Sequence, residues 1–124
     1  MRKIKVLTLE VDHKIKAIIP HVRFIDSDNT LEEMYRIIGC DLIDVVQVEV
    51  GRKYFDVYCD DEFLLKEKPV PTLFLNDEQV LCGNLVFTTC DRDGKLEDVS
   101  EEDIGKLIDF ILIQAVKLRI YLAK

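Results

Sequence analysis

Apolar and polar residues near the start of the chain are arranged as β-strands require. The stretches KIKVLTLEV (3–11) and KIKAIIP (14–20) are rich in β-branched residues, and Asp12 and His13 lie between them. This pattern predicts two strands joined by a short turn. Pro20 is expected to end the second strand, because proline has no amide hydrogen to donate to a sheet.

Strand signals return in the middle of the chain. LIDVVQVEV (42–50) is a β-branched run, and KYFDVYCD (53–60) alternates apolar and polar positions. Gly51 and Arg52 between them predict a tight hairpin. The segment 60–71 is charged and ends in two prolines, so it is expected to be a loop with room for one helical turn.

The next segments predict three further strands. TLFL (72–75) and QVLCG (79–83) flank the turn signal Asn76-Asp77, and NLVFTTCD (84–91) follows. Asp91-Arg92-Asp93-Gly94 then predicts a turn.

A helical period separates the second and third predicted strands. Asp28, Asn29 or Thr30 can cap a helix start, and Gly39 suits its left-handed end. Four apolar residues at spacing i, i+3, i+4, i+7 share one face of this helix over 30–39, namely Leu31, Met34, Tyr35 and Ile38.

The last quarter of the chain predicts a longer helix capped by Ser100, three residues before Asp103. One face is apolar, formed by Ile104, Leu107, Ile108, Ile111, Ala115 and Leu118. Other sides are apolar as well, so self-association as a twofold dimer is expected through Phe110, Leu112, Ile113, Val116 and Ile120. Residues 115–123 also alternate as a strand would, but no turn signal precedes them, which favours helix.

Together these elements predict a single α+β domain over residues 1–124, because 124 residues suffice for one compact core. A mainly antiparallel sheet packs against the short helix and the long C-terminal helix, since turns this short cannot accommodate parallel crossovers. The strand order does not follow from the sequence.

The charge balance bears on partners. With 24 acidic and 17 basic residues the net charge is −7, which disfavours nucleic acid and anionic membranes and favours a basic partner. The candidate partner-binding residues lie in two acidic segments, one formed by Asp60, Asp61 and Glu62 and the other by Glu97, Asp98, Glu101 and Glu102.

Candidate chemistry is sparse. Cys40, Cys59, Cys82 and Cys90 lack zinc-ligand spacing, so they are expected to be free thiols in a reducing cytoplasm, and no signal-peptide core precedes them. His13 and His21 have no nucleophile at a relay spacing. The loop 91–102 resembles a calcium loop but has a leucine where glycine is needed. No catalytic residue, metal site or cofactor is therefore predicted.

Several short stretches resemble the domain-of-unknown-function family three-eight-four-six. They are LEEMYRIIG (31–39), LIDVVQV (42–48), VYCDDEFLLKEKPVP (57–71), VLCGNLVFT (80–88) and LEDVSEEDIGKL (96–107). The residues after Asp109 look like an addition to this pattern. The resemblance implies an accessory protein of phages, plasmids or conjugative elements, and it supplies no catalytic or binding residues.

Two functions remain open from these observations. The first is a non-enzymatic protein-binding module of a mobile element. The alternative is a counter-defence inhibitor, anti-CRISPR or anti-restriction, that occupies the nucleic-acid-binding surface of a host nuclease. An enzyme with an unrecognised site is a third class, which nucleotide turnover in a hydrolase screen would reveal.

Overall fold

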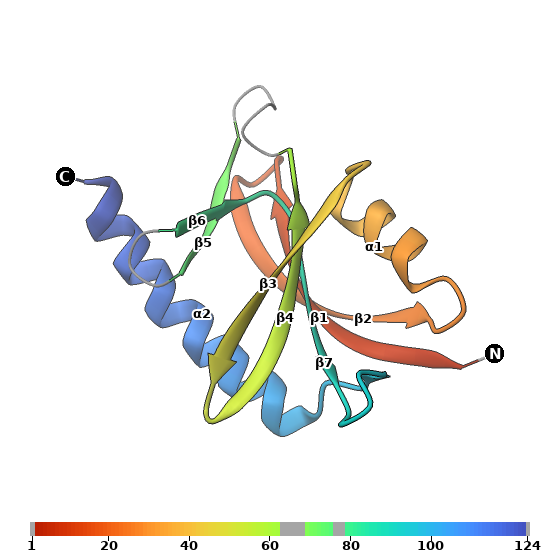
Figure 1. Ribbon diagram of the computed structural model, residues 1–124. Coiled ribbons are helices and arrows are strands. Elements are labelled where there is room, and N and C mark those ends of the chain that lie inside the picture. The colour runs from red at the N-terminus through yellow and green to blue at the C-terminus, as the bar shows by residue number, and fades with distance from the viewer. Residues whose placement is uncertain (1, 63–68, 76–78, 124) are drawn as a thin grey trace.

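The computed structural model describes residues 2–62, 69–75 and 79–123. Its main sheet has the strand order β2-β1-β7-β4-β3, with β8 paired to β7, and every neighbouring pair is antiparallel (Figure 1). These strands are β1 (Lys3–Asp12), β2 (Ala17–Asp26), β3 (Ile43–Val50), β4 (Lys53–Asp60), β7 (Leu85–Cys90) and β8 (Leu96–Glu97). A second, two-stranded sheet pairs β5 (Pro71–Leu75) with β6 (Gln79–Cys82), and the helices are α1 (Thr30–Ile38) and α2 (Glu101–Leu122).

The α+β prediction is confirmed, with a mainly antiparallel sheet, a short helix and a long C-terminal helix. The β3–β4 hairpin lies where the sequence predicts it. Gly51 and Arg52 both adopt positive φ, 59° and 68°, which is the turn geometry that matches the twist of paired strands. The predicted loop residues 63–68 and the turn at 76–78 lie outside the described residues.

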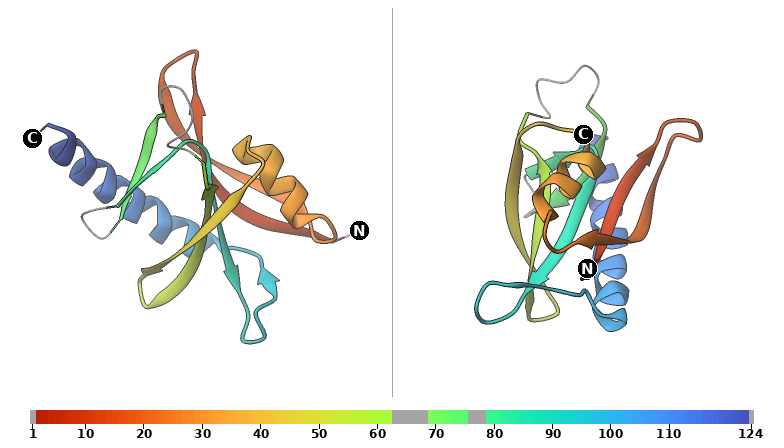
Figure 2. Two further views of the ribbon diagram at one scale, coloured as in Figure 1. Left: turned by 45° about the horizontal axis from the view of Figure 1, so that its top comes forward. Right: turned by 90° about the vertical axis from the view of Figure 1, so that its right-hand side faces the viewer.

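The two helices cover opposite faces of the main sheet (Figure 2). On one face, Leu7, Leu85 and Phe87 are buried together with Leu107 of α2 and with the β5–β6 pair. On the other face, strand residues of the opposite alternation pack against α1, among them Ile4, Val6 and Val86 with Met34 and Ile37. The fold therefore has two hydrophobic cores separated by one sheet.

The first hairpin differs from the prediction. β2 does not end at Pro20 but continues to Asp26, and the turn spans residues 13–16 instead of Asp12-His13. The Asp12 carboxylate accepts the amide of Lys14 (2.9 Å), and Lys16 adopts a φ of 55°, which together form the longer turn. Pro20 is tolerated because β2 is an edge strand, whose backbone nitrogens at every second residue face no neighbour.

The helices begin and end at the predicted signals. α1 follows Asn29 and ends at Gly39, whose φ is 75°. Its predicted apolar face is partly wrong, because Leu31 is 51% exposed while Ile37 is buried. α2 begins at Ser100, whose Oγ accepts the amide of Asp103 (3.0 Å), and the helix runs through Leu122, so the strand alternative for residues 115–123 does not hold.

Candidate functional site

Most of the cysteines are buried, which bears on whether their thiols can act as nucleophiles. None of the four forms a disulfide bond, as predicted, and Cys40, Cys59 and Cys82 are buried. Burial, with the Asp44, Asp61 and Asp60 carboxylates nearby, raises the pKa of Cys59 to about 12. Burial also raises the pKa of Cys82 and of Cys90. Thiols in such surroundings stay protonated at neutral pH, and the reactive form is the thiolate.

One open cavity lies between the C-terminal end of α1 and the start of β7. Its volume is about 220 Å³, and its lining includes Asp60, Asn84 and the exposed His13. Asn84 accepts the Val11 amide (2.7 Å) and donates to the Ile37 carbonyl (2.9 Å), so its side chain holds three backbone segments together. The cavity is smaller than the roughly 300–1,000 Å³ typical of small-molecule sites, and the side chains of Asn84 and Asp60 already bind backbone groups of the fold.

An ion pair on β1 and β2 was not predicted from the sequence. The Arg23 guanidinium donates to both carboxylate oxygens of Glu10, with Nη2 2.8 Å from Oε1, and Thr8 donates to Oε2. The Arg23 hydrogen bond is the main reason why the pKa of Glu10 is lowered, and burial only partly opposes it. The sequence alone does not reveal this ion pair, because Glu10 and Arg23 are not directly opposite each other in the register of the hairpin. It stabilises the hairpin and leaves the carboxylate ionised and occupied.

The acidic segment at the start of α2 is bound largely within the molecule. The Asp98 carboxylate accepts the backbone amide of Lys5 (2.8 Å), beside a bond from the Val99 amide to the Lys5 carbonyl (3.0 Å). Asp98 therefore ties the chain to β1. Glu101 pairs with Lys5 Nζ (3.3 Å) at the protein surface.

Glu102 and the buried Asp103 have basic partners too. Glu102 pairs with Lys106 at 3.2 Å, and the Asp103 carboxylate accepts from Lys53 Nζ at 2.8 Å. Basic side chains are thus interspersed along this segment, which weakens its negative field.

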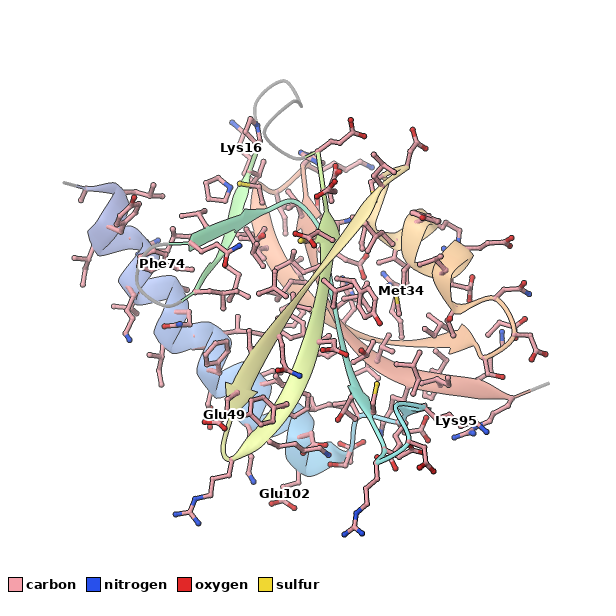
Figure 3. The ribbon with its side chains drawn as sticks, in the orientation of Figure 1. Lys16, Met34, Glu49, Phe74, Lys95 and Glu102 are labelled. Carbon is pink, nitrogen blue, oxygen red and sulfur yellow. The ribbon has the colours of Figure 1, made fainter. Side chains whose placement is uncertain are left out.

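The structure does not bring the two acidic segments together. Lys53, which binds Asp103, begins β4, and Asp60 ends the same strand, about 23 Å away at 3.3 Å per residue. In Figure 3 Glu102 lies at the lower end of the molecule, opposite the end at which Lys16 of the β1–β2 turn lies. Asp60 is also buried and accepts the amide of Glu62 (2.9 Å), whereas Asp61 is exposed.

The outward side of α2 carries an exposed apolar row. Leu112, Ile113, Val116 and Ile120 are 57–61% exposed. Leu107, Gln114 and Leu118 are buried on the inner side of α2, which contacts β5 and β3. At 100° per residue Val116 points directly away from Leu107. We call Leu112, Ile113, Val116 and Ile120 the outer row.

Phe110 does not belong to the outer row, because it packs partly against the core. The sequence indicates an excess of apolar residues in this helix. It does not indicate which of them face outward, since that depends on the rotation of α2 on the sheet.

These features define a small α+β protein whose polar interior groups serve the fold and whose long helix carries an apolar outer surface. The chain belongs to the family described as Domain of unknown function (DUF3846), whose model matches residues 4–111. The outer row begins one residue after that match. No curated protein and no solved structure matches the chain. In the part that the structure describes, no cluster of His, Cys, Asp and Glu fits a metal ion, and no helix is long and apolar enough to span a membrane.

Proposed function

We propose that this protein is a non-enzymatic protein-binding module of a mobile genetic element, and that it binds another protein chain through the outer row of α2. The observation that carries the proposal is the row itself. Four large apolar side chains in adjacent turns are more than half exposed, and contiguous apolar surface of this kind marks interaction sites. The mobile-element setting rests on the family resemblance.

Two further observations favour binding over catalysis. Burial raises the pKa values of the Cys59 and Cys82 thiols, and the carboxylate of Glu10 is held by Arg23 and Thr8. A general base or nucleophile needs a group that is free to exchange a proton near neutral pH.

The counter-defence alternative has less support. An inhibitor that imitates nucleic acid needs a dense negative surface, but the two acidic segments lie at opposite ends of β4. In addition, three carboxylates at the start of α2 form ion pairs with Lys5, Lys53 and Lys106, which reduce the negative charge of this surface.

The test compares two variants in binding assays. Leu112→Lys/Val116→Lys places two charges in the middle of the outer row, and lysine is a good helix former. Phe24→Lys is the matched control, because Phe24 is 60% exposed like Leu112 but lies on β2. The wild-type chain is first used to capture a binding partner from host cells. The purified partner is then titrated with the wild type and with each variant, and calorimetry measures the affinity of each.

We expect the double variant to lose at least tenfold in affinity, on the usual cost of removing central apolar contacts, and the control to bind like the wild type. Binding that is equally strong in the double variant contradicts the proposal. Turnover of a nucleotide in a hydrolase screen contradicts it as well.

A further inference from the structure

The outer row has a geometry that selects its occupant. Leu112, Val116 and Ile120 follow one another at four-residue steps, and Ile113 lies beside them. Asp109, one turn before Ile113, is exposed and continues the same side of the helix toward its N-terminus. A row of this spacing is the seam along which two α-helices pack lengthwise.

Charge distinguishes the two directions in which a second α2 could pack. Asp109 lies at the N-terminal end of the row, and the exposed Arg119 lies at its C-terminal end. A parallel pair would place Asp109 beside its own copy and bring the acidic starts of both helices together. An antiparallel pair places Asp109 of each helix at the level of a basic residue.

From this complementarity we infer that the outer row binds a second copy of this chain, with the two α2 helices antiparallel about a twofold axis at the level of residue 114. In that register Leu112 of one copy is level with Val116 of the other. Asp109 is level with Arg119, and Ile108 with Ile120. Each contact occurs twice, as a twofold interface requires. The inference rests on the proposed function, because it names the chain bound at the same surface.

The fold leaves room for this arrangement. The outer row lies on the side of α2 opposite its buried residues, which face β5 and the core of the main sheet. Two copies would therefore stack as sheet, helix, helix, sheet without moving either core. The C-terminal end of α2 is held against β5 by the ring contact between Tyr121 and Phe74, whose centroids are 4.9 Å apart, so the helix is already ordered before it pairs.

The area that the outer row can bury indicates how tightly two copies could associate. Burying four half-exposed aliphatic side chains removes on the order of 300 Å² of apolar surface per copy. Polar neighbours at the rim bring the total interface to about 1,000 Å², near the lower limit for specific complexes. The expected dimer is in the micromolar range.

Analytical ultracentrifugation of charge-swapped variants tests the inference. Asp109→Arg places like charges opposite Arg119 in an antiparallel pair, and Arg119→Asp places them opposite Asp109. Each single variant should raise the dimer dissociation constant about tenfold, and the double variant should restore it to within about threefold. In a parallel pair each position faces its own copy, so a swap only exchanges one like-charge contact for another, and the single variants would not weaken the dimer.

Two results overturn the inference. One is a wild-type chain that stays monomeric up to about 0.5 mM, well above micromolar association. The other is a dimer that is insensitive to the charge swaps and to Leu112→Lys/Val116→Lys. Circular dichroism melting confirms that each variant folds. If the chain is monomeric but another protein binds in a manner that depends on the outer row, the inference fails and the proposed function stands.

Discussion

At the scale of single residues, Asp103 shows how a carboxylate near the surface can serve the fold. Its side chain is 10% exposed in the first turn of α2, where it binds Lys53. Burial alone would raise the pKa of Asp103, but the hydrogen bond and charge of Lys53, together with hydrogen bonds from Ser100, outweigh burial and lower it. The ionised carboxylate therefore joins the start of α2 to the start of β4.

Asp103→Asn should reduce the free energy of unfolding by about 1–2 kcal/mol at pH 7, at the low end for a charged hydrogen bond because Lys53 is 43% exposed. The folded pKa lies below the unfolded value near 4, so this stabilisation is present above pH 4 and is lost as the pH falls through the folded pKa. Urea denaturation of both proteins at pH 7 and pH 3 measures it, and the difference should shrink at pH 3.

Glu102→Gln is the matched control for this prediction. Glu102 is the preceding carboxylate and also pairs with a lysine, but its side chain is 78% exposed. Its replacement should cost less than about 0.5 kcal/mol at either pH. Equal losses in the two variants would show that the Asp103 carboxylate contributes no more than a surface charge.

At the scale of elements, α2 presents two apolar sides with different roles. One side closes the core through Leu107 and carries the buried Leu118 further along, and the other is the outer row. Deleting the chain after Asp109 would remove the buried Leu118 and the outer row at once, together with the contact between Tyr121 and Phe74. Single substitutions are therefore needed to separate packing from association.

Leu118→Ala should lower the free energy of unfolding by about 2–3 kcal/mol, because it leaves a cavity beneath the helix. Val116→Ala, two residues away, should change it by less than about 0.5 kcal/mol, since Val116 is 61% exposed. Both are measured by urea denaturation at protein concentrations below the association range. A large loss in Val116→Ala under those conditions would mean that the outer row packs within the monomer.

At the scale of the whole molecule, β7 is the centre of the fold. It pairs with β1 on one side and with β4 on the other, and its residues Val86 and Phe87 are fully buried on opposite faces of the sheet. β2, by contrast, is an edge strand. The free energy of local opening should therefore be highest at β7 and should decrease toward the edge strand β2.

Hydrogen exchange should reveal this gradient. The amides of Val86 and Phe87 should exchange only on global unfolding, because neither local fraying nor solvent reaches them. Ile18, Val22 and Phe24 are separated from Pro20 by an even number of residues, so their amides also face the open edge of β2. These amides should be among the fastest to exchange. Nuclear magnetic resonance resolves both groups, and slow exchange at Val22 and Phe24 in the monomer would show that another segment covers this edge.

The features that could be predicted from the sequence depend on near neighbours in the chain. Gly51-Arg52, Gly39 and Ser100 each set a turn or a helix end, and all three are found where expected. The position of β7 between β1 and β4 could not be predicted, because it depends on pairing between strands that are distant in sequence.

The candidate site was less predictable for the same reason. The sequence does not distinguish an exposed carboxylate, such as Asp61, from one that accepts a hydrogen bond from a distant backbone amide, such as Asp98. The difference appears only in the folded chain, where Asp98 lies beside Lys5 of β1 and accepts its backbone amide. The apolar excess of α2 is visible in the sequence, but its division into a core side and an outer row depends on how the helix lies on the sheet.

Pro20 has a consequence for how copies of this chain can assemble. An open sheet edge is a template on which strands of further molecules can add without limit, as in fibrils. On β2 that template is interrupted, because Pro20 has no amide hydrogen and the Asp26 amide is already bound by Glu33 (3.1 Å). Polymerisation through this edge is therefore disfavoured even where crowding in a cell brings many copies of the chain together.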